Sequence, residues 1–275
     1  MKMLILGGNG MAGHLLVKYF QSSGKHAVFY TTRDRCDSQG LVLDVTDMSA
    51  VEQVVKAVRP DMIINAVGVL NQFAETDKIN AYHINGFLPH RLRHLADMIS
   101  ARLIHISTDC VFLGTKGGYV ESDTPDGVSS YALTKALGEV NEPDHLTIRT
   151  SIIGPEVRKS GIGLLNWFMK QRGEVSGYRR VMWNGVTTLE LAKAIEFFMN
   201  RDVGGLIHLA HPKPLNKYEL LLLFKDIWGK EDVTIRPSDH MVQDRTLQST
   251  RLDAAYLFPD YAQMLREMHV WQQNH

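Results

Sequence analysis

The first half of the chain alternates short apolar runs with amphipathic stretches. The apolar runs lie at residues 3–6, 27–32, 41–43, 62–64 and 103–106. Short runs that are apolar at nearly every position are typical of parallel strands buried on both faces. Helical periodicity follows the first, third and fourth runs, and it returns after residue 130. This alternation predicts an α/β fold with a doubly wound parallel sheet of the Rossmann type.

The pattern becomes less regular after Pro155. Helical periodicity covers residues 163–172, 189–200, 218–228 and 264–271, and strand-like runs lie at 205–210 and 233–235. We therefore expect two unequal parts. Residues 1–155 are predicted to form a dinucleotide-binding Rossmann domain, to which the segment 184–200 returns. Residues 156–275 are predicted to form mainly a smaller C-terminal substrate-binding lobe.

The composition is that of an ordinary soluble globular protein, with 44% apolar and 22% charged residues. Thirty basic residues balance thirty acidic residues, so no overall field attracts nucleic acid or an anionic membrane. No apolar run is long enough to span a bilayer, and the run before the first glycine is too short for a signal peptide. We expect a cytoplasmic protein that binds neither nucleic acid nor membrane.

Metal chemistry is not predicted either. Cys36 and Cys110 are too few for a disulfide framework or a four-thiolate site. His83, His90 and His94 lie roughly on one side of a predicted helix, but no acid or cysteine completes a ligand set. A solvated or interface helix face is the better interpretation, and we expect no metal.

A glycine-rich segment joins the first strand to the first helix. Gly7, Gly10 and Gly13 recur at every third position, with Met11 among them. Glycine permits a tight turn, lets the backbone approach a pyrophosphate, and allows the helix to pack close to the strand. The helix N-terminus then presents free N–H groups to the phosphates. A plain glycine turn is the alternative, but the strand–glycine–helix order favours a dinucleotide site at these four residues.

The end of the second strand bears on the choice of cofactor. An acid at this place recognises the ribose 2′-hydroxyl of NAD(H), whereas a base suits the 2′-phosphate of NADP(H). The chain has Thr32 followed by Arg33, and a guanidinium is well suited to a phosphate. We therefore favour NADP(H) over NAD(H), with a solvated loop arginine as the alternative interpretation.

Two further strand ends carry candidate cofactor contacts. Asp44 and Val45 follow the third strand, where the side chains can contact the adenine ring, although Asp44 is equally suited to cap the next helix. Asn65, Ala66 and Val67 follow the fourth strand, where small residues allow a ligand to lie against the backbone.

The segment 105–135 carries the candidate catalytic chemistry. Thr108 follows the fifth strand, and Tyr131 and Lys135 lie four residues apart, on one face of a predicted helix. A phenol loses its proton near pH ~10, and a neighbouring cation stabilises the phenolate. A lone Tyr-x-x-x-Lys arises by chance on many helices. Here, however, the glycine loop, Asn85 and Thr108 are all predicted at the carboxyl edge of the sheet, where ligands bind.

Together these motifs resemble the extended branch of the short-chain dehydrogenase/reductase superfamily, and most closely its dTDP-4-dehydrorhamnose reductase group. The resemblance rests on Gly7-x-x-Gly10-x-x-Gly13, Asp44-Val45, Asn65-Ala66, Asn85, the segment 107–112, the segment 119–123, Tyr131-x-x-x-Lys135, Gly138-Glu139 and the segment 148–151. It covers about the first 155 residues well and the remainder loosely.

The resemblance implies an NADPH-dependent reductase acting on the C4 ketone of a nucleotide-linked 4-keto-6-deoxy sugar in polysaccharide biosynthesis. Tyr131 would protonate the ketone oxygen while the cofactor delivers hydride, and Thr108 would hydrogen-bond the developing oxyanion. Lys135 would lower the pKa of Tyr131 and hold the nicotinamide ribose, supported by Asn85. The resemblance also implies a homodimer packed through helices near residues 87–99 and 131–140.

Asp109 and Cys110 separate this chemistry from related reactions. Nucleotide-sugar 4,6-dehydratases similar to this chain have Asp-Glu here, so the missing second carboxylate disfavours dehydration. GDP-fucose synthases, which epimerise before reducing, are similar in having a cysteine at this place, but residues 146–207 lack their histidine. The closest reductases usually carry aromatic residues where this chain has Cys110 and Ile152, which leaves the nucleotide and the sugar open.

Two other functions therefore stay as alternatives. One is a nucleotide-sugar epimerase/reductase that uses Cys110. The other is a non-catalytic, NADP-binding regulatory subunit similar to the methionine adenosyltransferase β subunit.

In the smaller lobe, three residues join Asp109 and Cys110 as candidate substrate contacts. Trp167 is suited to stack on a nucleotide base, and Arg179 or Arg180 to pair with a diphosphate. The alternatives are core packing for the tryptophan and a solvated charged loop for the arginines.

Overall fold

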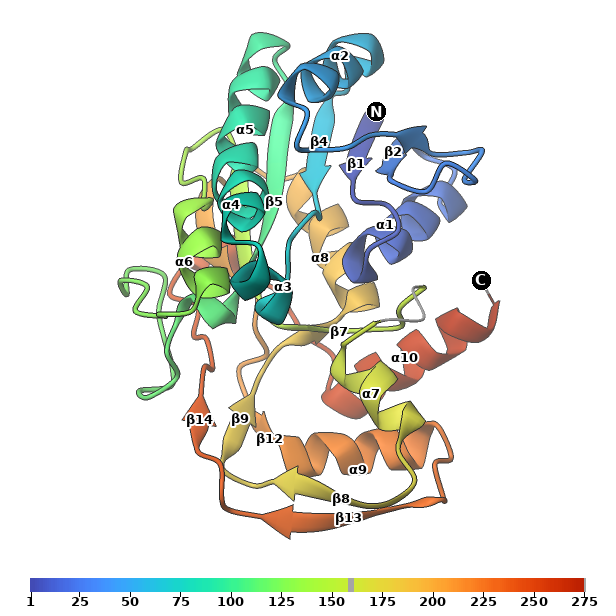
Figure 1. Cartoon of the computed structure of the whole chain (residues 1–275), viewed down its shortest axis with the longest axis vertical. Helices are drawn as coiled ribbons and strands as arrows, with labels where there is room; N and C mark the ends of the chain where they lie inside the picture. Colours follow the sequence, from blue (N-terminus) through green and yellow to red (C-terminus); the bar gives the residue numbers. More distant parts are fainter. Residues whose placement is uncertain (158–160, 275) are drawn as a thin grey trace.

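The computed structural model describes residues 1–157 and 161–274. Its centre is a seven-stranded sheet in the order β3-β2-β1-β4-β5-β6-β11, with every neighbouring pair parallel. Figure 1 labels β2, β1, β4 and β5 of this sheet. The strands are β1 (Lys2–Leu6), β2 (Ala27–Thr32), β3 (Leu41–Val42), β4 (Met62–Asn65), β5 (Arg102–Thr108), β6 (Leu146–Thr150) and β11 (Gly205–His208). The predicted doubly wound parallel sheet is confirmed.

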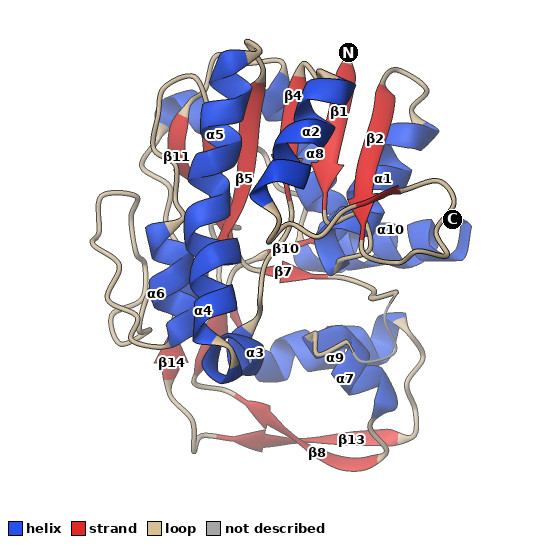
Figure 2. Ribbon diagram, turned by 45° about the horizontal axis from the view of Figure 1, so that its top comes forward, coloured by secondary structure: helices blue, strands red, loops and turns tan. Residues whose placement is uncertain are grey.

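Helices cover both faces of this sheet, as Figure 2 shows. On one face lie α1 (Met11–Ser22) and α8 (Thr188–Met199), and on the other lie α2 (Met48–Val58) and α5 (Leu88–Met98). Strand β1 serves both cores because its side chains alternate in direction: Met3 and Ile5 join the first, and Leu4 and Leu6 the second. Burial on both faces explains why the strand runs are continuously apolar.

The connection from β4 to α5 is more broken than the single predicted helix. It contains α3 (Asn71–Thr76), α4 (Lys78–Ala81) and a π-helical turn, η1 (Tyr82–Phe87), before α5 begins. Asp77 separates the first two helices, since its carboxylate accepts a hydrogen bond from the Asn80 N–H at 3.1 Å. The π-helical turn carries Asn85, a residue of the candidate active site.

Most of the remaining elements form a smaller lobe beyond the carboxyl edge of the sheet (Figure 1). They include short sheets of two and three strands, β10-β7, β12-β9-β14 and β13-β8. These elements are β7 (Ile152–Ile153), α7 (Leu164–Lys170), β8 (Gly173–Tyr178), β9 (Val181–Trp183), β10 (Val186–Thr187), β12 (Leu215–Asn216), α9 (Lys217–Ile227), β13 (Val233–Ser238), β14 (Gln243–Asp244), η3 (Leu252–Ala254) and α10 (Tyr261–Asn274). Two further elements, η2 (Asp109–Val111) and α6 (Ser130–Leu137), follow β5 at the sheet.

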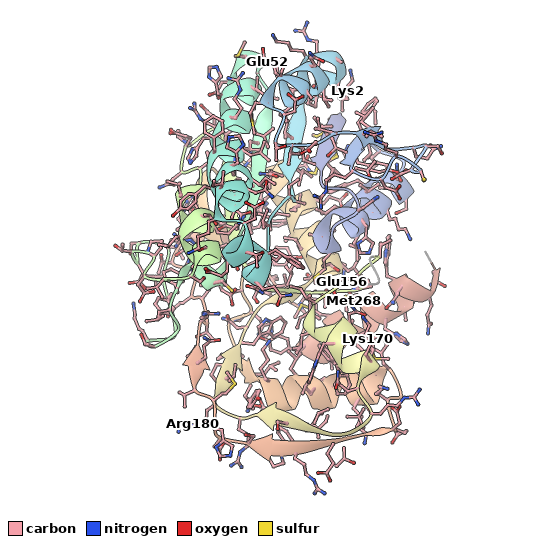
Figure 3. All side chains as sticks on the ribbon, viewed as in Figure 1. Lys2, Glu52, Glu156, Lys170, Arg180 and Met268 are labelled. Atoms are coloured by element: carbon pink, nitrogen blue, oxygen red, sulfur yellow. The ribbon has the colours of Figure 1, made fainter. Side chains whose placement is uncertain are left out.

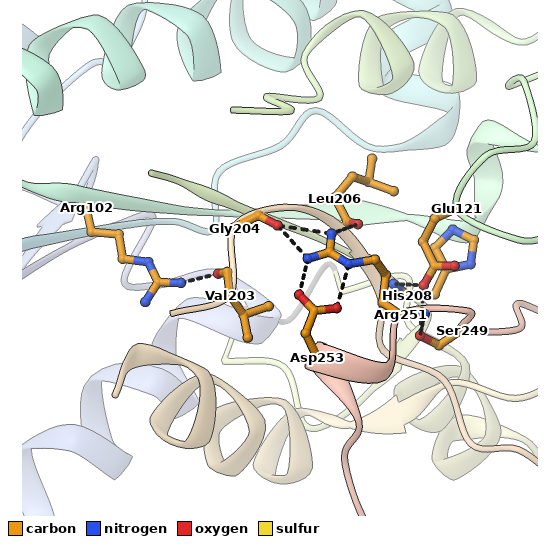
Figure 4. A network of polar contacts seen from close by, with 9 residues as sticks. All are labelled: Arg102, Glu121, Val203, Gly204, Leu206, His208, Ser249, Arg251 and Asp253. Carbon is orange, nitrogen blue, oxygen red and sulfur yellow. Dashed lines mark hydrogen bonds and ion pairs between the residues drawn. The ribbon is translucent and has the colours of Figure 1, made fainter. Parts of the chain in front are cut away.

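Two features tie the lobe's chain segments back to the sheet. The run 205–210, which fell within the range predicted for the lobe, contains β11, which pairs with β6 at the sheet edge. Figure 4 shows the second feature: the Arg251 guanidinium donates to the carbonyls of Gly204 and Leu206 at 3.1 and 3.2 Å and pairs with Asp253. The segment after β14 is thereby held on β11, the edge strand of the sheet.

Candidate active site

The glycine-rich turn has the geometry of a phosphate cradle. Gly7 has a φ of +83°, which favours glycine, and a Cβ on Gly13 would lie 2.0 Å from the Gly7 carbonyl oxygen. Helix α1 begins directly after Gly10, and in the described part of the chain no side chain caps this helix N-terminus. A dinucleotide pyrophosphate fits this turn, because it needs free N–H groups and close backbone approach. Met11 lies beside it, against Gly163 of the lobe.

The ends of β2 and β3 lie next to this turn. Thr32 is buried, and its hydroxyl accepts a hydrogen bond from the Asn9 amide at 2.8 Å. Arg33 is exposed, and its charge helps to lower the pKa of Asp44, after the larger effect of hydrogen bonds from Thr46. Asp44 does not cap α2, because Asp47 does so. Val45 is buried in the core beneath.

Asn65, Ala66 and Val67 follow at the end of β4, next to the glycine turn. A Cβ on Gly7 would lie 3.2 Å from the Ala66 carbonyl oxygen and 3.0 Å from the Val67 side chain. The Asn65 side chain is fully buried and accepts from the Val67 N–H at 3.2 Å. These residues therefore line the same edge of the sheet as the phosphate cradle.

The predicted catalytic residues converge where β5 meets α6. Thr108 ends β5, and its side chain lies close enough to Tyr131, the second residue of α6, to lower the pKa of that phenol. Ser129 caps α6 by accepting from the Ala132 N–H at 3.1 Å, which starts the helix so that Tyr131 lies in its first turn. Lys135 follows one turn later and is only 3% exposed.

The electrostatics of Tyr131 differ from the expectation. Burial raises its pKa, the Cys110 and Asp109 groups raise it further, and only the Thr108 side chain lowers it. Lys135 is not among the groups that lower the pKa of Tyr131, and its Nζ is directed to the Ile106 carbonyl at 2.7 Å and to His105 at 3.3 Å. Burial lowers the pKa of Lys135 itself to about 8, partly opposed by Glu139.

Asn85 links the catalytic helix to the loop after β4. Its amide oxygen accepts from the Val69 N–H at 2.8 Å, and its amide nitrogen donates to the Val69 carbonyl at 2.9 Å and to the Thr134 hydroxyl at 3.1 Å. Its carbonyl lies against Gly138, where an added Cβ would approach to 1.9 Å. Asn85 thus contacts α6 through Thr134, the residue before Lys135.

A cluster of ionisable groups beside Tyr131 was predicted from the sequence only in part. Asp109 and Cys110 follow Thr108 directly, and the lobe adds Lys217 and Arg245. Arg245 donates to the Cys110 sulfur at 3.6 Å although the two residues are 135 positions apart. Burial raises the pKa of Asp109 and that of Cys110, the latter to about 12, and lowers the pKa of Lys217 to about 8. No local sequence pattern marks Lys217 or Arg245 for this place.

The three candidate contacts in the lobe are all exposed. Trp167 on α7 is 39% exposed, whereas its neighbour Phe168 is fully buried. Arg179 is exposed and pairs with Asp239 at the end of β13, with one contact at 2.9 Å. Arg180 is exposed at the outer end of the lobe, away from the central sheet (Figure 3).

Within residues 1–157 and 161–274, no group of three His, Cys, Asp or Glu side chains is placed to hold a metal ion. Across the same residues, no helix is long and apolar enough to cross a membrane.

A strand-end hydroxyl, a buried tyrosine and a lysine one turn later, beside a glycine-rich cradle, define the centre of an α/β oxidoreductase. The chain belongs to the RmlD substrate binding domain family, which matches residues 1–255. The resemblance to the dTDP-4-dehydrorhamnose reductase group is therefore confirmed.

The relatives include two kinds of protein, reductases and a methionine adenosyltransferase subunit. A dTDP-4-keto-6-deoxy-D-glucose reductase of Streptomyces niveus is 27% identical over 85% of this chain and 81% of its own length. The methionine adenosyltransferase 2 subunit beta of Rattus norvegicus is 25% identical over 86% of this chain and 75% of its own length. Among solved structures, the dTDP-4-dehydrorhamnose reductase of Bacillus anthracis in complex with NADP has the same fold, with a TM-score of 0.83, 22% identity and coverage of 98% and 99% of the two chains.

Proposed function

We propose that the protein is an NADPH-dependent reductase of the C4 ketone of a nucleotide-linked 4-keto-6-deoxy sugar. The observation that carries the proposal is the placement of Thr108 next to Tyr131, both buried at the carboxyl edge of the sheet that also carries the glycine cradle. The reductase named in Streptomyces niveus supports the same reaction class. Both NADPH and nucleotide-linked sugars are available in the cytoplasm, where we place its action.

Tyr131, Thr108 and Lys135 have different roles in the reduction of a ketone. The cofactor, when bound, supplies hydride to C4, and the electron pair of the carbonyl bond moves to its oxygen. Tyr131, kept protonated by its raised pKa, then gives its proton to that oxygen, which Thr108 also hydrogen-bonds. The phenolate left on Tyr131 is stabilised by Lys135 once that side chain carries charge.

Arg33 supports the choice of NADP(H) over NAD(H). Its guanidinium is exposed beside the end of β2, where the adenosine ribose of a dinucleotide would lie. We expect Arg33→Gln to weaken NADPH binding by roughly tenfold to a hundredfold, because a charge-assisted contact of about 1.5–3 kcal/mol is lost. NADH binding should stay unchanged, and fluorescence titration of both cofactors measures the two affinities. Equal losses for both cofactors would contradict the assignment.

We also propose that residues 1–155 with 184–200 form the dinucleotide-binding part and that 156–275 mainly bind the nucleotide sugar. The packing of α8 against α1 and the approach of Lys217 and Arg245 to Asp109 and Cys110 support this division.

The test is NADPH oxidation with dTDP-, UDP- and GDP-linked 4-keto sugars. In Tyr131→Phe the proton donor is lost while the ring remains, so we expect turnover to fall about a hundredfold to ten-thousandfold with NADPH affinity retained. Tyr82→Phe is the matched control, because Tyr82 is 46% exposed on η1, and its turnover should not change. A wild-type protein that binds NADPH but reduces none of these sugars would disprove the reductase.

The methionine adenosyltransferase subunit among the relatives favours a second candidate, a regulatory subunit that binds the dinucleotide without catalysis. Such a protein has no need of a proton donor. Its partner-dependent effect would be the same in wild type and Tyr131→Phe, whereas a reductase loses turnover. The buried tyrosine beside Thr108 favours the reductase.

A further inference from the structure

Three buried polar side chains form a chain of contacts that ends at Lys135. Asn65 ends β4, His105 lies beside it on β5, and Lys135 comes from α6. The Asn65 amide nitrogen lies 3.1 Å from His105 Nδ1, and His105 Nε2 lies 3.3 Å from Lys135 Nζ. All three residues are at most 3% exposed. The proposed reaction gives His105 no role, yet this ring contacts the lysine directly.

The direction of each hydrogen bond follows from the backbone. The Val67 N–H donates to Asn65 Oδ1 at 3.2 Å, so the amide NH₂ of Asn65 faces His105. An NH₂ group only donates, and His105 Nδ1 must therefore accept and carry no hydrogen. A neutral imidazole with a bare Nδ1 carries its hydrogen on Nε2. That N–H points at Lys135 Nζ.

The direction of this hydrogen bond determines which protonation state of Lys135 fits. An ammonium has three donors and no lone pair, so it would meet the His105 donor with a donor. A neutral amine accepts from His105 and still donates to the Ile106 carbonyl at 2.7 Å. Burial acts in the same direction, since it lowers the pKa of Lys135 to about 8 and the pKa of His105 well below its usual range.

The other charged groups that act on this pair are few in the described part of the chain. Glu139, which follows α6, favours the charged form of Lys135, and His90 of α5 further lowers the pKa of His105. Glu139 is already engaged by Arg149 and Ser107, with contacts of 2.6 to 2.7 Å. It does not displace the His105 donor.

We infer that His105 is a positioning residue that favours the neutral amine of Lys135 in the cofactor-free protein, so that in alkaline solution dinucleotide binding is coupled to uptake of one proton by Lys135. The inference rests on the proposed contact of Lys135 with the nicotinamide ribose. Bound dinucleotide brings ribose oxygens that accept hydrogen bonds and phosphates that add negative charge, and both favour the ammonium. The proton comes from solvent, and no other bond changes. In alkaline solution Lys135 is then charged only in the loaded complex, where a phenolate has to be stabilised.

The pH dependence of NADPH affinity tests this in the wild-type protein. Because binding takes up a proton, affinity should be flat below the pKa of Lys135 in the free protein. Above that pKa, near pH 8, it should fall about tenfold per pH unit. Titrations start above about pH 7, where the 2′-phosphate is already ionised. Calorimetry in buffers of different ionisation enthalpy should show uptake approaching one proton per site at high pH. Affinity independent of pH, with no proton uptake, would overturn the inference.

Two substitutions distinguish the effect of the His105 N–H donor on the pKa of Lys135 from the effect of burial. His105→Phe keeps a buried ring without the N–H donor, so the break in the affinity profile should move up by about one pH unit. Asn65→Asp places a carboxylate that accepts from His105 Nδ1–H, which turns Nε2 into an acceptor for the ammonium and also moves the break upward. In the His105→Phe background, the effect of Asn65→Asp should shrink, because the ring that transmits it is gone. His94→Phe, on the exposed side of α5, is the control and should leave the break in place.

A break that moves to lower pH in His105→Phe would show that His105 accepts from an ammonium, and the inference would be wrong. Failure of the proposed function looks different. In that case, NADPH binds without supporting turnover of any 4-keto sugar, wherever the break lies.

Discussion

At the scale of single residues, burial sets the protonation of the site. Tyr131 and Cys110 both have raised pKa values, so both are neutral acids at neutral pH. A protonated phenol is the form that a ketone reduction requires, because it delivers a proton to the carbonyl oxygen. A protonated thiol is a poor base for removing a carbon-bound proton. The same burial therefore favours reduction over epimerisation.

Cys110 gives a direct test of that distinction. In Cys110→Ala we expect kcat to change no more than a few-fold, because the thiol takes no part in reduction. The product formed in deuterium oxide with NADPH should carry no deuterium at the ring carbons beside C4. Mass spectrometry and NMR of the product measure this. Deuterium at C3 or C5 in the wild type that disappears in Cys110→Ala would establish the epimerase/reductase instead.

At the scale of elements, a buried ion pair fastens the catalytic helix to the sheet. Glu139, just after α6, accepts from Arg149 of β6 at 2.6 and 2.7 Å, and from Ser107 of β5 at 2.7 Å. Both side chains of the pair are less than 8% exposed. The guanidinium also lies 5.1 Å from the centre of the Phe112 ring. The end of α6 is thereby tied to two central strands.

Removing one partner of this pair should be costly. Glu139→Gln leaves the Arg149 guanidinium buried without its counter-charge, and we expect a loss of about 3–5 kcal/mol in the free energy of unfolding. Urea denaturation followed by circular dichroism measures it. Glu174→Gln breaks an exposed pair with Arg236 of β13 and serves as the control, for which the midpoint should barely move. Equal effects of both substitutions would contradict the structural role of Glu139.

At the scale of the whole molecule, we propose that two copies pair through the face formed by η1, α5 and α6. Apolar side chains are exposed there, including Phe87 (51%), Leu133 (48%) and Leu137 (57%). The predicted dimer helices, 87–99 and 131–140, carry these residues. An isologous dimer would cover this face on both copies.

Sedimentation velocity at micromolar concentration tests the pairing. We expect the wild type to sediment as a dimer and Leu137→Glu as a monomer, because a buried, unpaired carboxylate at such an interface is strongly unfavourable. Leu257→Glu is the control, since Leu257 is 95% exposed in the segment before α10 and lies outside the proposed face. A monomeric wild type would disprove the dimer.

The first five strands of the central sheet followed from the sequence because each rests on a local signal. Continuous apolar runs marked strands that are buried on both faces, and the glycine spacing marked the turn where Gly13 meets Gly7. The helical spacing of Tyr131 and Lys135 placed them on one face, and the strand end placed Thr108 nearby. The broken helix near Asn85 and the return of β11 to the sheet were not predicted, since neither alters the local periodicity.

Sequence alone thus determined which residues could carry the chemistry, because residue type and short spacing are local properties. Only the tertiary structure decided their protonation and partners. The pKa of Tyr131 rises rather than falls because burial depends on the packing of the whole molecule, and Lys135 is turned toward His105. Arg245 reaches Cys110 from 135 positions away, and no local pattern encodes a contact between segments that meet only when the chain has folded.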